Sequence, residues 1–216
     1  MKQHTTISQS ASLTVPFTQG GLIIGITGGS GSGKTTLLNE IRKAGGLILD
    51  CDAIYHQLLK TDKALLAAIE SRFPGTVRGG TLDRNALGKI VFSRQADLAA
   101  LNEITHGNVI KEVQRQLKNH QGLAAIDAIA LLESGLAALC DVTVAITAPE
   151  EIRITRLMKR DGITADAAKK RLDAQKDTAY YQENCDYTLE NNGSFEDFQG
   201  KCLAFLRQLG IMKAEV

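Results

Sequence analysis

Residues 28–35 read Gly-Gly-Ser-Gly-Ser-Gly-Lys-Thr and match the pattern G-x-x-x-x-G-K-[ST] of a phosphate-binding loop, the P-loop. An apolar run from Leu22 to Ile26 precedes the loop and is typical of a buried strand. Apolar residues at helical spacing follow it, at Leu37, Leu38 and Ile41. A chance match in a flexible Gly/Ser turn would not have this context, so the loop is predicted to bind a nucleoside triphosphate.

Further apolar segments along the chain predict more strands of the same kind. Helical patterns separate them, and alternating strands and helices favour parallel pairing with right-handed crossovers. We therefore expect an α/β fold of the P-loop NTPase type with a doubly wound, parallel, five-stranded sheet. The other four predicted strands are Leu47–Leu49, Leu123–Ile126, Val142–Ile146 and the weaker Tyr187–Leu189.

Two segments do not fit a simple crossover. The segment from Ala53 to about Asn119 is long and helix-rich, and it is interpreted as an inserted helical subdomain. The segment from Arg153 to Tyr181 is rich in charged residues and is interpreted as a solvated helical lid. The expected boundaries are a disordered leader at 1–20 and one domain at 21–216, with core parts 21–56, 106–152 and 183–210, the inserted subdomain at 57–105 and the lid at 153–182.

The composition and charge of the chain argue against several classes of binding partner. A chain of 216 residues fits one domain, and 25 Lys and Arg against 24 Asp and Glu give a net charge of +1. This balance gives no electrostatic case for a nucleic acid or membrane partner. The four cysteines form no C-x-x-C pair, and neither a membrane span nor a signal peptide is recognisable. We expect a cytoplasmic monomer with free thiols.

The residue types of the loop suit phosphate binding. Glycines let backbone N–H groups converge on phosphate oxygens in conformations that a Cβ would block. Lys34 would supply a positive charge to the β- and γ-phosphates of ATP, and the Thr35 hydroxyl would ligate Mg²⁺.

Carboxylates follow two of the predicted strands. Asp50 and Asp52 end the second strand, and Asp127 ends the third. Ligands of open α/β sheets bind at this edge, where one carboxylate could orient an attacking hydroxyl. Alternatively, Asp50 or Asp52 caps the helix that starts near Ala53. Asp127 either holds Mg²⁺ through water or accepts backbone hydrogen bonds at the strand end.

Four blocks of the chain, in order, resemble the dephospho-coenzyme A kinase family, which phosphorylates the ribose 3′-hydroxyl of dephospho-CoA. The resemblance runs from about Leu22 to Leu206, and its most specific part is the third block. The blocks are Ile26–Thr36; Asp50–Ala53; Leu82–Phe92 with Leu101–His106; and Arg156–Asp161 with Ala174-Gln175 and Asn191–Gly193.

The resemblance implies a role for each matching position, with ATP and Mg²⁺ as cofactors and dephospho-CoA as the substrate. Asp52 would be the catalytic base, Lys34 a catalytic phosphate ligand and Arg160 the lid arginine that stabilises the transferring phosphoryl group. The implied ATP-binding residues are Gly29, Ser30, Gly31, Ser32, Gly33, Lys34, Thr35, Thr36 and Asn191, the last beside the adenine. The implied acceptor-binding residues are Thr27, Asp50, Arg84, His106 and Glu133.

Simpler interpretations remain open for several of these residues. His106 could be a structural histidine, Arg84 could lie on a solvated helix, and Glu133 could anchor a loop. The charge run formed by Arg153, Arg156, Lys159 and Arg160 could be a solvated face. The chain also has Ile129 and Gly107 where the family usually has proline.

Two other functions also compete with this one. The first is a small-molecule or nucleoside or nucleotide kinase of the same fold that acts on a different acceptor. The second is a nucleotide-binding regulatory module that has lost transfer activity. The intact Lys34, Asp52 and Arg160 argue against the second.

Overall fold

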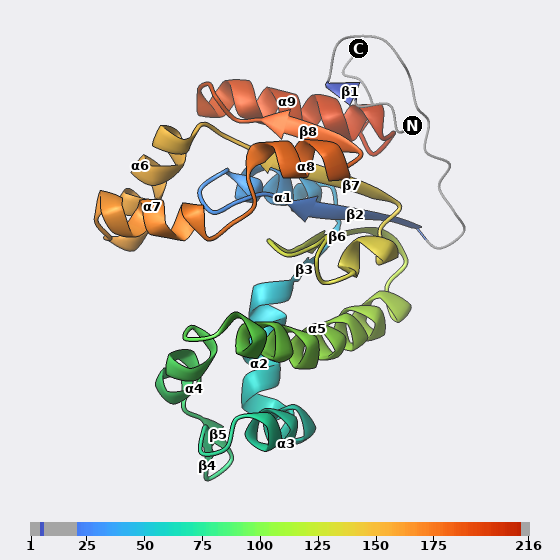
Figure 1. The fold of residues 1–216 in the computed structure, drawn as a ribbon. Coiled ribbons are helices and arrows are strands. Elements are labelled where there is room, and N and C mark those ends of the chain that lie inside the picture. The colour runs from blue at the N-terminus through green and yellow to red at the C-terminus, as the bar shows by residue number, and fades with distance from the viewer. Residues whose placement is uncertain (1–4, 7–20, 213–216) are drawn as a thin grey trace. The chain divides into compact units, whose positions relative to one another are not determined.

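The computed structural model describes residues 5–6 and 21–212 (Figure 1). The predicted leader, 1–20, therefore lies outside the described residues except for Thr5 and Thr6. The chain divides into two compact units, one made of residues 1–48 and 121–216 and the other of residues 49–120. The bounds expected for the inserted subdomain, 57–105, fall within the second unit.

The central sheet has the strand order β1-β8-β7-β2-β6-β3. Strand β2 pairs in parallel with β6 on one side and with β7 on the other, and β7 pairs in parallel with β8. The predicted parallel sheet of five strands is confirmed, and the two-residue β1 adds a sixth at the β8 edge. The bounds are β1 (Thr5–Thr6), β2 (Gly21–Thr27), β3 (Leu47–Asp50), β6 (Gly122–Asp127), β7 (Val142–Thr147) and β8 (Tyr187–Glu190).

Helices cover both faces of the sheet in the first unit, as a doubly wound fold requires (Figure 1). Side chains alternate between faces along a strand. In β7, Val144 and Ile146 pack into the main core with α1 (Lys34–Lys43) and α9 (Phe195–Gln208). Ala145, between them, packs instead against Tyr181 of α8 (Thr178–Asn184). A short 3-10 helix, η1 (Leu136–Leu139), precedes β7.

The predicted lid segment, 153–182, covers most of α6 (Glu150–Asp161), all of α7 (Ala165–Asp173) and the first part of α8 (Figure 1). The turn between α6 and α7 begins at Gly162, whose φ of 66° is in the left-handed region that favours glycine. Leu157, Ala168 and Leu172 are buried between the two helices. The segment therefore has a small apolar core of its own beneath its charged surface.

The second unit is mainly helical and has a separate core. Two breaks interrupt the helical pattern of the sequence in this unit. Phe73-Pro74-Gly75 lies at a turn, and Gly79-Gly80 lies in a small hairpin that the sequence does not reveal. Buried residues such as Leu65, Ile69 and Phe73 hold the helices together. No helix in the described part of the chain is long and apolar enough to cross a membrane. The elements are α2 (Cys51–Thr61), α3 (Lys63–Arg72), β4 (Val77–Arg78), β5 (Thr81–Leu82), α4 (Arg84–Val91) and α5 (Gln95–Lys118).

Two of the three phenylalanines of α9, Phe195 and Phe205, provide a matched test of the main core. Phe205 is fully buried and meets the Tyr187 ring edge-on at 5.2 Å between centroids, whereas Phe195 is 61% exposed. Phe205→Ala should lower the free energy of unfolding by about 3–5 kcal/mol, since it leaves a cavity. Phe195→Ala should change it by less than about 0.5 kcal/mol. Urea denaturation measures both, and equal losses would contradict the assigned packing.

Candidate active site

The P-loop joins the end of β2 to the start of α1, as the sequence predicts. Gly28, Gly31 and Gly33 have φ angles of 130°, 78° and 101°, which residues with a Cβ rarely adopt. A Cβ on Gly33 would also collide with the Nδ2 atom of Asn191. Both the backbone conformation and the packing therefore require glycine at position 33.

Asn191 holds the P-loop to the neighbouring strands. It is buried (4% exposed) directly after β8, and its backbone N–H donates to the Thr147 carbonyl at 2.7 Å. Its side-chain Nδ2 donates to the Ser32 carbonyl at 2.8 Å, and its Oδ1 accepts from Arg156 Nη2 at 3.1 Å. Arg156 Nη1 in turn donates to the carbonyls of Gly31 and Ser32, at 3.2 and 3.3 Å. The structure thus places the predicted Asn191 against the loop.

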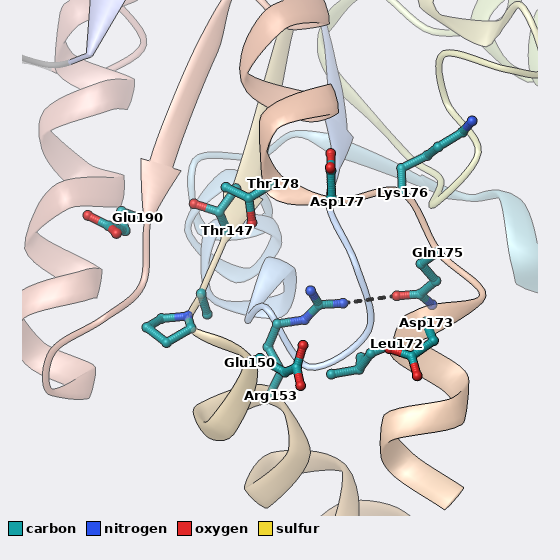
Figure 2. Close-up of a pocket in the computed structure, with 12 residues that line it drawn as sticks. Thr147, Glu150, Arg153, Leu172, Asp173, Gln175, Lys176, Asp177, Thr178 and Glu190 are labelled. Atoms are coloured by element: carbon teal, nitrogen blue, oxygen red, sulfur yellow. Dashed lines mark hydrogen bonds between the residues drawn. The ribbon is translucent and has the colours of Figure 1, made fainter.

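A second group of contacts joins the loop to the lid segment at Ser30. Arg153 Nε donates to the Ser30 carbonyl at 2.9 Å, and Gln175 Oε1 accepts from the Ser30 N–H at 2.9 Å. Gln175 Nε2 also donates to the Ser30 hydroxyl at 2.8 Å. Figure 2 shows Arg153 pointing across to Gln175, to which its Nη2 donates at 3.0 Å. The two side chains border a pocket of about 410 Å³.

The loop has polar groups that fit a bound triphosphate and its metal ion. The Lys34 ammonium donates to the Gly28 carbonyl at 2.9 Å, so it lies over the loop. The Ser32 hydroxyl oxygen is buried and has no hydrogen-bond partner among the described residues. The described residues also contain no cluster of three or more His, Cys, Asp or Glu able to hold a metal. The Thr35 hydroxyl, exposed in the first turn of α1, is an oxygen donor of the kind that Mg²⁺ binds.

Three predicted residues lie in the first unit near the ends of the central strands. Thr27, fully buried at the end of β2, donates its hydroxyl to the Ile129 carbonyl at 3.0 Å. Asp127 ends β6 and is half-buried. Glu133 is exposed and lies near α8, where burial together with its carboxylate raises the pKa of Tyr181 to about 12.

The other predicted residues belong to the second unit. Asp50 is the N-cap of α2 and accepts the Ala53 N–H at 2.9 Å, as the capping alternative predicts, and its role toward an acceptor stays a prediction. Asp52 is exposed in the first turn of the same helix. Arg84 is exposed at the start of α4, with its Nη2 3.3 Å from His56 Nδ1. His106 is half-buried in α5, which continues through Gly107, a position where proline would disturb the helix.

Arg160 has a different environment from Arg153 and Arg156. It is 61% exposed and donates to Asp161 through Nε at 2.7 Å, and Arg171 donates to the same carboxylate at 2.5 Å. These two guanidinium groups lower the pKa of Asp161 to about 2. Sequence reasoning selected Arg160 and treated Arg153 and Arg156 as part of a charge run. Their spacing of three residues, which places them on one face of α6, was the available signal.

The chain matches a known protein family along most of its length. The family model described as dephospho-CoA kinase matches residues 22–197. The chain belongs to the dephospho-CoA kinase family. It is 33% identical over 193 residues to the dephospho-CoA kinase of Lactobacillus johnsonii, covering 87% of this chain and 98% of that one. It is 35% identical over 184 residues to the enzyme of Latilactobacillus sakei, covering 82% and 91%.

Solved structures agree with this membership. A protein of Thermus thermophilus has a TM-score of 0.75 and 33% identity, covering 88% of this chain and 98% of its own. A dephospho-CoA kinase from Campylobacter jejuni has a TM-score of 0.62 and 26% identity with the same coverage. A shikimate kinase from Bacteroides thetaiotaomicron, at 17% identity and a TM-score of 0.53, shares the P-loop kinase fold.

Substitution of two glycines with similar φ angles distinguishes the effect of backbone strain from that of packing in this kinase. Gly45, with φ of 84°, ends α1 and has open space around it, whereas Gly33 faces Asn191. Both Gly33→Ala and Gly45→Ala should lose about 1–2 kcal/mol of stability from the left-handed backbone. Only Gly33→Ala should also raise the Kd for ATP, by at least about tenfold, the equivalent of one displaced loop contact. Calorimetric titration and thermal melting measure the two effects, and tight ATP binding by Gly33→Ala would contradict the assignment.

Proposed function

We propose that this protein transfers the γ-phosphoryl group of ATP to the ribose 3′-hydroxyl of dephospho-CoA, giving CoA and ADP. This reaction is the last step of coenzyme A biosynthesis. The observation that carries the proposal is the match to the dephospho-CoA kinase family over nearly the whole chain, with the phosphate loop intact. The likeness to shikimate kinases concerns the fold alone and does not favour a different acceptor.

The loop would hold the triphosphate of ATP. The Gly29–Thr36 backbone and the start of α1 offer N–H groups, and a helix N-terminus favours an anion. Lys34 would move from the Gly28 carbonyl to the β- and γ-phosphate oxygens, and Thr35 would donate a hydroxyl ligand to Mg²⁺. When bound, Mg²⁺ neutralises the phosphate oxygens, and Asp127 would hold it through water. Asn191 and its neighbours would border the adenine.

Phosphoryl transfer needs one base and one added positive charge. Asp52 would accept the proton of the 3′-hydroxyl as its oxygen attacks the γ-phosphorus and the bond to the ADP oxygen breaks. Its exposure at the start of α2 leaves the carboxylate accessible to a substrate. Arg160 would leave Asp161 to stabilise charge on the transferring group, and an exposed ion pair of this kind costs little to break.

The acceptor would be bound by Thr27, Asp50, Arg84, His106 and Glu133. Ile129 and Gly107 replace prolines usual in the family, and neither replacement removes a polar group from that set. The Thr27 hydroxyl already has the Ile129 carbonyl as a partner, so the backbone at position 129 fixes its orientation. We also propose a cytoplasmic monomer. The four cysteines are all free thiols, which suits a reducing compartment.

The direct test is incubation of the purified protein with ATP, Mg²⁺ and dephospho-CoA. We expect one added phosphate on the ribose 3′-oxygen, located by fragmentation in mass spectrometry, and equimolar ADP. Removal of Mg²⁺ with EDTA should abolish the product. A panel of nucleosides, nucleoside monophosphates and pantetheine precursors is the control. Faster ADP release with one of these acceptors would identify another small-molecule kinase, and tight ATP binding without any turnover would identify a regulatory module.

Substitution of the proposed base separates chemistry from binding. Asp52→Asn should lower kcat by about 10²- to 10⁴-fold, because the amide cannot accept the proton. The Kd for ATP should stay within about twofold. Asp62→Asn is a matched control in the same unit, since Asp62 caps α3 and asparagine caps equally well. Equal losses of turnover and ATP binding in Asp52→Asn, or loss of turnover in the control, would count against the base role.

A further inference from the structure

Ser30 is bonded to the lid segment through every polar group that it has. Its carbonyl accepts from Arg153, its N–H donates to Gln175, and its hydroxyl accepts from Gln175. The two lid side chains are also bonded to one another, at 3.0 Å (Figure 2). A closed set of four hydrogen bonds therefore ties one residue of the phosphate loop to residues more than 120 positions later in the sequence.

Gly29 leaves space for the side chains that bind Ser30, and its backbone angles do not themselves require glycine. Its φ is outside the left-handed region, so its own conformation accepts a side chain. A Cβ at this position would instead overlap the Arg153 guanidinium and lie 2.9 Å from Gln175 Oε1. The absence of a side chain at position 29 thus makes room for the two lid residues.

We propose that Gln175 is a positioning residue that, together with Arg153, holds the P-loop in the shape that binds ATP. The inference rests on the proposed function, because it concerns the same nucleotide site. A binding-competent shape that is only partly populated raises the apparent Kd in inverse proportion to its population. Loss of the Gln175 contacts would lower that population. Saturating ATP would restore the shape, so turnover at saturation would change much less.

The effect should be visible in the binding constant for ATP. In the full-length chain, Gln175→Leu should raise the calorimetric Kd of Mg-ATP about tenfold, the loss expected for two net neutral hydrogen bonds. At saturating ATP, kcat should stay within about threefold, and the KM for dephospho-CoA within about twofold. Gln175→Glu keeps acceptors for Ser30 and Arg153 but adds a negative charge beside the triphosphate site, so its Kd should lie between those of the unmodified protein and Gln175→Leu. Gly29→Ala, which disturbs the same contacts from the loop side, should also raise the Kd of Mg-ATP.

The matched control is Gln182, which is exposed on α8 in the same unit. Gln182→Leu and Gln182→Glu should leave Kd, kcat and KM unchanged. The inference is overturned if Gln175→Leu lowers the melting temperature but leaves the Kd unchanged, or if it lowers kcat at saturating ATP with an unchanged Kd. It is also overturned if Gln182→Leu gives the same rise. An unmodified protein that binds no ATP would overturn the proposed function as well, which distinguishes the two failures.

Discussion

A phosphate loop turns its backbone N–H groups toward a bound anion, so its carbonyl oxygens are not paired within a helix or a sheet. Such carbonyls need other hydrogen-bond donors when they are buried. In this protein, side chains from distant elements supply them. Arg153 donates to the Ser30 carbonyl, and Arg156 and Asn191 both donate to the Ser32 carbonyl. The phosphate loop therefore depends on residues far from it in the sequence. The rest of the first unit can be understood as the scaffold that brings those residues to the loop.

The sheet order explains how this convergence arises. Carboxyl ends of parallel strands meet at one edge, and β7 lies between β2 and β8. The loop after β2, the Thr147 carbonyl at the end of β7 and Asn191 after β8 are thus brought together at one edge. Helix α6 starts three residues after β7 ends, which places Arg153 and Arg156 in its first two turns, within reach of the loop. Topology, more than local sequence, makes the site.

This dependence explains what the sequence could and could not predict. Strands and α1 were predictable because apolar runs and helical spacing are local signals, and the P-loop because its composition is specific. The strand order was not predictable from those signals, since pairing is nonlocal. The hairpin β4–β5 was missed because two-residue strands leave no pattern. Arg153 and Arg156 were interpreted as solvated charges, because the sequence does not distinguish an arginine that donates to a backbone carbonyl from one that faces water. Asn191 was identified only through the family resemblance.

The lid arginines differ in what they are bonded to, and this difference suits different tasks. Arg153 and Arg156 donate to backbone carbonyls, and burial lowers their pKa values without removing their charge. Displacement of either arginine would leave loop carbonyls with fewer hydrogen-bond donors, which costs free energy. Arg160 faces a carboxylate in solvent that Arg171 also holds, so Asp161 keeps a cationic partner when Arg160 leaves. An arginine that moves with the transferring phosphoryl group should leave no buried polar atom without a hydrogen-bond partner. Among these three arginines, Arg160 meets that condition.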